Sequence, residues 1–229
     1  MSGLQTIINN CQSIEIDRRK VVGSQITRNE VIRTSVTPTF QPWRFRVTMP
    51  SRFRYSEARA LLESLDTLDK SVPQVVTFGD VDCLSWMFRY QGAANPAQLQ
   101  STTVQSFVGK TLTLTNLPAI PATAPLFRPN DLIQIGNKPH PFTSEQEVLR
   151  GTGTTVTVST HRPNILTGNI IGDTIRVGNS CQFNLLCLNM PTYRLNPGGF
   201  LKDRFGRTIN NALIEFSSEF VLHEFVATA

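Results

Sequence analysis

The sequence contains few of the residues from which catalytic and metal sites are built. Among its 229 residues there are only three histidines and four cysteines. There is no Cys-x-x-Cys pair, no His-Glu-x-x-His motif, no Gly-x-Ser-x-Gly turn and no Walker-type phosphate loop. A metal site normally needs several ligands at a recognisable spacing, and no such spacing occurs. We therefore expect no catalytic residues, no metal site and no cofactor, and we do not expect an enzyme.

The positions of the histidines agree with this expectation. His140 and His161 are placed at the edges of a predicted loop and a predicted strand, and two histidines alone rarely make a metal site. His223 lies in the last predicted strand near Glu219 and Glu224, where we expect an ordinary surface pair.

The few cysteines give no indication of disulfides. Cys181 and Cys187 are the closest pair in the sequence. They would lie about 20 Å apart in an extended strand, which is too far for a disulfide. We interpret all four cysteines, Cys11 and Cys83 included, as small buried apolar residues of a protein that folds in a reducing cytoplasm.

Long hydrophobic runs are also missing, and charge is sparse. Residues 1–10 have neither the basic start nor the apolar stretch of a signal peptide, and no later run approaches the length of a membrane span. We therefore expect no membrane insertion. Charged residues make up 17% of the chain, and the net charge is +5. Because the basic residues are scattered, this charge permits nucleic acid as a partner but does not indicate a binding site.

Two segments carry the strongest structural signals. Residues 43–49 alternate large apolar with polar side chains, which predicts a strand with one buried face; the apolar positions are Trp43, Phe45, Val47 and Met49. Residues 55–68 have apolar residues at three- and four-residue spacing, which predicts an amphipathic helix with Ser56 as its N-cap. The apolar positions of this helix are Ala58, Leu61, Leu62, Leu65 and Leu68.

The remaining segments predict mostly strands. In the main part of the chain we expect strands or strand pairs within residues 13–28, 31–37, 73–78, 81–89, 181–190 and 213–226. Composition changes at Gln91, and a polar connector runs to Gln105. Short strands then follow within residues 109–115, 131–135, 141–149, 154–159 and 173–177, while the proline-rich residues 118–129 are expected to form a loop. Close spacing of short strands is typical of a small barrel.

These signals predict a mainly β, α+β fold. Residues 1–90 plus 181–229 form the main domain, a β-sandwich with one flanking helix. Residues 91–180 form an inserted small β-barrel. Insertion at a surface hairpin costs little, because the two ends of the hairpin already lie close together.

The order of the segments resembles that of structural proteins of tailed bacteriophages, the family that forms the tail tube, the distal tail ring and the baseplate hub. The strand at 40–49, the helix at 55–68 and the strand at 73–78 carry this resemblance. Two further segments look like an insert of some virion proteins, namely residues 127–135 (FRPNDLIQI) and 156–163 (VTVSTHRP), and residues 214–226 look like the family's closing strand. The resemblance implies a tail-tube-like β-sandwich without catalytic residues.

The resemblance also implies how such a protein works. Subunits of this kind join sheet edges into a ring, which we expect to be a hexamer, and contact other tail tube and baseplate proteins. DNA is expected only as passing cargo, and the protein is expected in the virion after synthesis in the host cytoplasm. The candidate residues for the oligomer interface or the lumen are Arg44, Arg46, Arg52 and Arg54, for which an ordinary surface role is equally open.

One alternative function remains open at this stage. In this alternative, the protein is a binding module whose inserted barrel contacts carbohydrate or single-stranded nucleic acid. Against nucleic acid, the only aromatic rings in the insert are Phe107, Phe127 and Phe142. Against carbohydrate, the insert as delimited here contains neither Trp nor Tyr.

Overall fold

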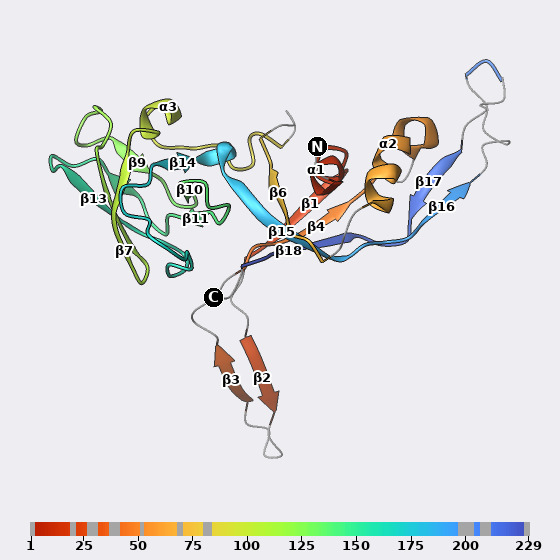
Figure 1. Cartoon of the computed structure of the whole chain (residues 1–229), viewed down its shortest axis with the longest axis horizontal. Helices are drawn as coiled ribbons and strands as arrows, with labels where there is room; N and C mark the ends of the chain where they lie inside the picture. Colours follow the sequence, from red (N-terminus) through yellow and green to blue (C-terminus); the bar gives the residue numbers. More distant parts are fainter. Residues whose placement is uncertain are drawn as a thin grey trace. The chain divides into compact units, whose positions relative to one another are not determined.

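The computed structural model describes residues 3–18, 22–26, 32–36, 42–50, 53–67, 71–79, 84–196, 204–206 and 212–226; for 22–26 and 32–36 it describes the backbone alone. This part of the chain is mainly β, with few helices (Figure 1). The chain divides into two compact units. Unit 1 comprises Met1–Asp17, Trp43–Val76 and Asn184–Phe225, and unit 2 comprises Arg18–Pro42, Thr77–Phe183 and Val226–Ala229. Unit 2 therefore includes residues 77–90, which precede the insert delimited from the sequence.

Unit 1 is built on a five-stranded sheet with the strand order β1-β4-β18-β15-β6. These strands are β1 (Ser13–Asp17), β4 (Arg44–Thr48), β18 (Phe220–Glu224), β15 (Gln182–Asn189) and β6 (Gln74–Thr77). Strand β4 pairs antiparallel with β1 on one side and with β18 on the other. Segments from the beginning and the end of the chain thus share one sheet.

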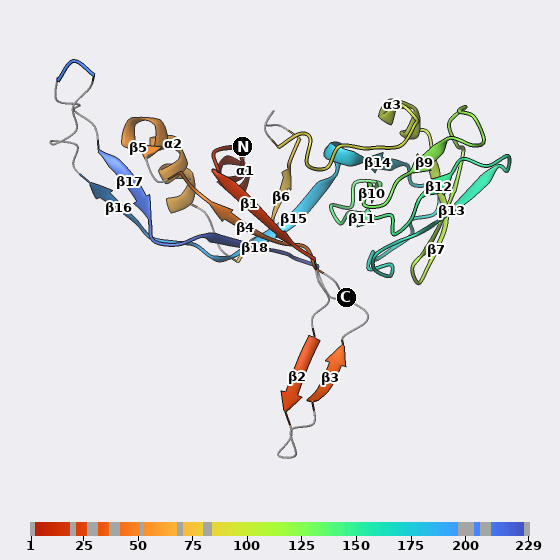
Figure 2. The same ribbon diagram turned by 180° about the vertical axis from the view of Figure 1, so that it is seen from behind.

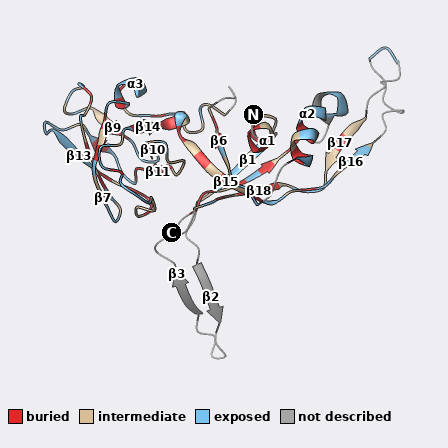
Figure 3. Cartoon of the chain, in the orientation of Figure 1, coloured by how far each residue is buried: buried red, intermediate tan, exposed pale blue. Residues whose placement is uncertain are grey.

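Two helices lie on one side of this sheet (Figures 1 and 2). They are α1 (Gly3–Asn9) and α2 (Tyr55–Asp66). Their inward side chains are buried, as Figure 3 shows by colour; they are Leu4, Ile7, Ile8, Ala58, Leu61, Leu62 and Leu65. The buried residues of β4, Phe45 and Val47, and Trp43 just before it, complete this core, and the Trp43 and Phe45 rings are stacked with centroids 6.1 Å apart. The strand and the helix predicted from the sequence are therefore confirmed.

The N-terminal region differs from the sequence expectation in two ways. Helix α1 was not predicted, because seven residues are too few to form a stable helix without tertiary packing. The predicted N-cap, Ser56, lies inside α2. The cap position is occupied by Arg54, whose extended backbone makes no side-chain capping bond. Helix α2 thus follows β5 (Phe53–Arg54) directly, and it is held by its buried stripe.

A smaller sheet completes unit 1. Its order is β16-β17-β5, with β16 at Tyr193–Asn196 and β17 at Leu213–Phe216. The single closing strand expected within residues 213–226 is therefore two strands, β17 and β18, which belong to different sheets. The break between them lies at residues 217–219, where the backbone bends.

Unit 2 contains several short antiparallel sheets. Their orders are β13-β8-β7, β11-β10-β14 and β12-β9, and β2 (Val22–Ile26) pairs separately with β3 (Ile32–Val36). The other strands are β7 (Thr103–Val108), β8 (Thr111–Thr115), β9 (Pro125–Phe127), β10 (Leu132–Ile135), β11 (Phe142–Thr143), β12 (Val148–Leu149), β13 (Thr155–Ser159) and β14 (Ile175–Val177), with α3 at Pro96–Leu99 and a 3-10 turn, η1, at Gly178–Ser180. None of the described sheets closes into a barrel, so the expected inserted small β-barrel was wrong.

Unit 2 differs from the sequence expectation in its connections as well. The proline-rich segment 118–129 was expected to be a loop, but it contains β9, whose first residue is Pro125, a position at which a strand tolerates proline. The strand expected over residues 81–89 is also wrong for its described part, because residues 84–88 form consecutive turns. Its alternating apolar residues do not share a buried face: Trp86 is 70% exposed.

A pair of substitutions on β4 tests the two faces of the sheet in unit 1. We expect Phe45→Ala to lower the free energy of unfolding by about 3–5 kcal/mol, because Phe45 is completely buried and its removal leaves a cavity. The neighbouring Arg46 points to the exposed face and loses only its cross-strand pairing with Glu15, so Arg46→Ala should change the same quantity by no more than about 1 kcal/mol. Urea unfolding followed by circular dichroism measures both. Equal losses in the two variants would contradict the assigned faces.

Candidate assembly surface

The face of the five-stranded sheet that points away from the core carries rows of polar residues across neighbouring strands. Cross-strand register places Glu15 of β1 opposite Arg46 of β4, and Asp17 opposite Arg44. On the other side of β4, His223 of β18 lies opposite Arg44. Glu15 and Arg46 are exposed, whereas Asp17, Arg44 and His223 are half-buried. We call these five residues the charged face.

The signs on the charged face alternate. Each arginine of β4 has a carboxylate directly opposite it on β1. Opposite charges at such positions contribute on the order of 0.2–1 kcal/mol each to pairing of the two strands. The alternation also means that this face is nearly neutral as a whole. It therefore offers no continuous positive surface for a phosphate backbone.

Of the four candidate arginines, the structure brings two together. Arg44 and Arg46 share the same face of β4. Arg54 is exposed, but it belongs to β5 in the smaller sheet and pairs there with Leu213. Arg52 lies outside the described residues. The carboxylates of β1 were not among the candidates, although their alternation with Ile14 and Ile16 was visible in the sequence.

The sheet ends at β1 on one side and at β6 on the other. Both of these strands expose an apolar side chain: Ile16 of β1 is 39% exposed and Val75 of β6 is 46% exposed. Val72, just before β6, is 53% exposed. A strand at the end of a sheet has backbone groups available for pairing, and exposed apolar residues on it favour association with another strand.

Glu224 fixes the start of β4. Its carboxylate Oε2 accepts a hydrogen bond from the Trp43 backbone N–H at 3.1 Å, and the Glu224 backbone N–H donates to the Trp43 carbonyl at 2.8 Å. Glu224 is buried, so these bonds compensate for part of the cost of removing the carboxylate from water. The surface pair expected for His223 therefore does not involve Glu224, which points to the core side of the sheet.

His223 has a perturbed pKa. Burial lowers the pKa of His223 below 6.5, the positive charge of Arg44 lowers it further, and Asp17 acts in the opposite direction. The neighbour on the other strand is Leu186 of β15, which is apolar. The neutral form of His223 is thus favoured in the folded protein.

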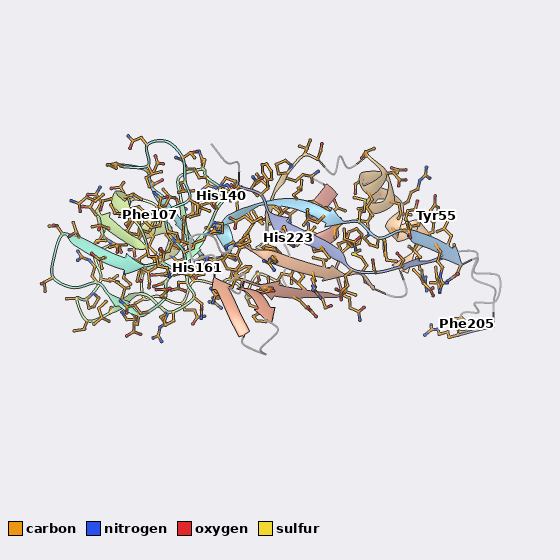
Figure 4. The ribbon with its side chains drawn as sticks, turned by 90° about the horizontal axis from the view of Figure 1, so that it is seen from below. Tyr55, Phe107, His140, His161, Phe205 and His223 are labelled. Atoms are coloured by element: carbon orange, nitrogen blue, oxygen red, sulfur yellow. The ribbon has the colours of Figure 1, made fainter. Side chains whose placement is uncertain are left out.

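The remaining histidines lie in unit 2 (Figure 4). The Nδ1 atom of His161 accepts a hydrogen bond from the Thr143 backbone N–H at 2.9 Å, and His161 is almost fully buried. His140 borders a small surface hollow. Among the described residues there is no group of three or more potential metal ligands.

Of the four cysteines, Cys181 and Cys187 are buried, as expected, and neither forms a disulfide. Cys11 is only half-buried, which the sequence did not indicate, because it follows the end of α1. Cys83 lies outside the described residues. Within the described part of the chain, no helix is long and apolar enough to span a membrane.

Comparison with known proteins adds no relative. A scan against models of protein families and a search of curated proteins each found no match to this chain.

The position of His223 predicts how the stability of unit 1 depends on pH. Because its pKa is lower in the folded chain than in the unfolded chain, protons bind preferentially to the unfolded chain, and stability falls as the pH drops below about 6.5. We expect His223→Gln to remove this part of the loss, and Asp17→Asn to enlarge it. Urea unfolding between about pH 5 and pH 8 measures the dependence. An unchanged slope in His223→Gln would contradict the assignment.

Proposed function

We propose that this chain is a non-enzymatic structural protein of a tailed-bacteriophage virion. In this proposal it forms a ring, as a baseplate hub or distal tail component, and links the tail tube to the baseplate around the DNA channel. The fold of unit 1, a five-stranded sheet with helices on one face and a charged opposite face, is the observation that carries the proposal.

The two ends of the sheet support association into a ring. They are different strands, β1 and β6, so a contact of β1 in one copy with β6 in the next joins two different surfaces. Contacts of this head-to-tail kind generate a closed ring when the rotation from one copy to the next is a whole fraction of a full turn. The exposed Ile16 and Val75 would be covered in such a contact. Closing the ring would also remove the free edges, which otherwise promote aggregation.

The charged face suits the wall of a DNA channel. A channel must let the phosphate backbone pass without holding it, and strong binding would need a continuous basic surface. On the charged face, Glu15 and Asp17 stand opposite Arg46 and Arg44. In a ring whose sheets run side by side, this face would point to the lumen, while α1 and α2 would lie outside.

Unit 2 has its own buried core, drawn from strands β7 to β14 and from α3. In the proposed assembly it contacts neighbouring baseplate proteins. The separate β2–β3 hairpin offers a second such element.

The ring proposal is tested at the edge of β6. We expect the purified protein, alone or with its tail partners, to form rings in negative-stain electron microscopy, with six copies as the expected symmetry. Val75→Lys should abolish the rings, because a lysine on an edge strand opposes strand pairing. Val108→Lys, at an exposed position of β7 in unit 2, is the matched control and should leave them intact. Rings that persist in Val75→Lys would refute pairing through β6, and a monomer under all conditions would refute the function.

A further inference from the structure

Trp86 is the only tryptophan of the chain that is exposed, since the other, Trp43, is almost fully buried. Trp86 lies in unit 2, in the series of turns at residues 84–88. The backbone there is held by two hydrogen bonds, from Met87 N–H to the Leu84 carbonyl at 3.0 Å and from Arg89 N–H to the Trp86 carbonyl at 3.2 Å. A single exposed aromatic residue is common, so its surroundings decide whether it has a role.

The residues that follow Trp86 are anchored firmly in unit 2. The Phe88 ring packs against Phe78 and Phe183, each with a centroid distance of 5.5 Å. Tyr90 is buried, its hydroxyl donates to the Leu126 carbonyl, and its ring meets Phe127 edge-on. These contacts fix the backbone on the C-terminal side of Trp86. The exposure of Trp86 is therefore a property of a well-anchored loop.

A close approach of backbone fixes the loop further. Gly178 has a φ of +64°, and a Cβ placed on it would lie 2.7 Å from the Tyr90 nitrogen. Only glycine therefore allows η1 to approach the loop this closely. Asn179, the next residue in η1, lines the same surface hollow as Trp86.

A hollow of about 450 Å³ opens beside Trp86, a size in the range of small-ligand sites. The residues that line it include Ser85, Trp86, Arg89, Tyr90, Pro96 and Asn179. Among the described residues, no carboxylate lines the hollow and no acidic side chain forms an ion pair with Arg89. The hollow thus combines an aromatic face, an amide and one cation.

We propose that this hollow binds a saccharide with an acidic group. The face of an aromatic ring is electron-rich and attracts the C–H groups of a sugar ring, so Trp86 would stack on the sugar. The Asn179 amide both donates and accepts hydrogen bonds, as sugar hydroxyls require. The Arg89 guanidinium is suited to a carboxylate or phosphate on the sugar, which it binds in a bidentate manner.

The composition of the hollow favours a saccharide over a single-stranded nucleic acid. Nucleic-acid grooves present successive aromatic platforms and several cations that follow the backbone. Of the described residues that line this hollow, Arg89 is the only charged one and Trp86 is the only exposed aromatic one. The proposal does not depend on ring formation. The sequence disfavoured carbohydrate because residues 91–180 contain neither Trp nor Tyr. This objection does not apply to unit 2, because Trp86 and Tyr90 belong to it.

Titration calorimetry of the full chain with trigalacturonate, maltotriose and a short oligothymidylate tests the proposal. We expect trigalacturonate to bind, and Trp86→Ala to weaken that binding about tenfold or more. Trp86→Phe should keep part of the affinity. Arg89→Gln should weaken trigalacturonate binding and leave binding of maltotriose unchanged. Phe205→Ala removes another exposed ring, 68% exposed in unit 1, and should have no effect.

Several results would overturn the proposal. No binding of either saccharide at concentrations up to about 10 mM would do so, as would full affinity in Trp86→Ala. Binding of oligothymidylate alone, lost in Trp86→Ala, would assign the hollow to nucleic acid instead. Maltotriose bound as tightly as trigalacturonate would remove the role of Arg89. Unchanged thermal midpoints would show that the variants are folded, and ring formation scored on the same samples would separate this test from that of the assembly.

Discussion

Strand β4 is the constraint on which unit 1 depends. One of its faces packs Phe45 and Val47, preceded by Trp43, against the helices, and the other holds Arg44 and Arg46 opposite the carboxylates of β1. A shift of register by one residue would exchange these faces, burying two arginines and exposing two large apolar side chains. Burial of the first face thus fixes the position of the second. The proposed channel wall therefore follows from the hydrophobic core.

A comparable constraint acts at the base of the loop that carries Trp86. Asp131 is buried, and its two carboxylate oxygens accept hydrogen bonds from the backbone N–H groups of Gln91 and Arg128, at 2.9 and 2.8 Å. Burial raises the pKa of Asp131, while these hydrogen bonds oppose the shift. Together with the bond of the Tyr90 hydroxyl to the Leu126 carbonyl, they tie residues 90–92 to the strands of unit 2. The loop is therefore presented from a fixed base.

The two proposals concern different units and combine without conflict. Unit 1 has the free edges and the charge-balanced face that a ring around DNA requires, whereas unit 2 has the hollow lined by Trp86 and Arg89. A ring would present several copies of that hollow at once. Weak individual sites then bind a repetitive surface with much higher overall affinity, provided that several engage simultaneously.

The sequence by itself determined the mainly β class, the strand at β4 and the helix at α2, because a local alternation or a three- to four-residue spacing is enough to define one buried face. It also identified Arg44 and Arg46 as sharing a face. Only the tertiary structure decided which strands flank β4, that α1 covers the sheet, that unit 2 contains open sheets in place of a barrel, and that Trp86 is exposed. Strand pairing joins residues such as Glu15 and Arg46, or Arg44 and His223, that are far apart in the sequence, and periodicity carries no information about such partners. At residues 84–88, the tertiary contacts of Phe88 and Tyr90 outweighed a local pattern that suggested a strand.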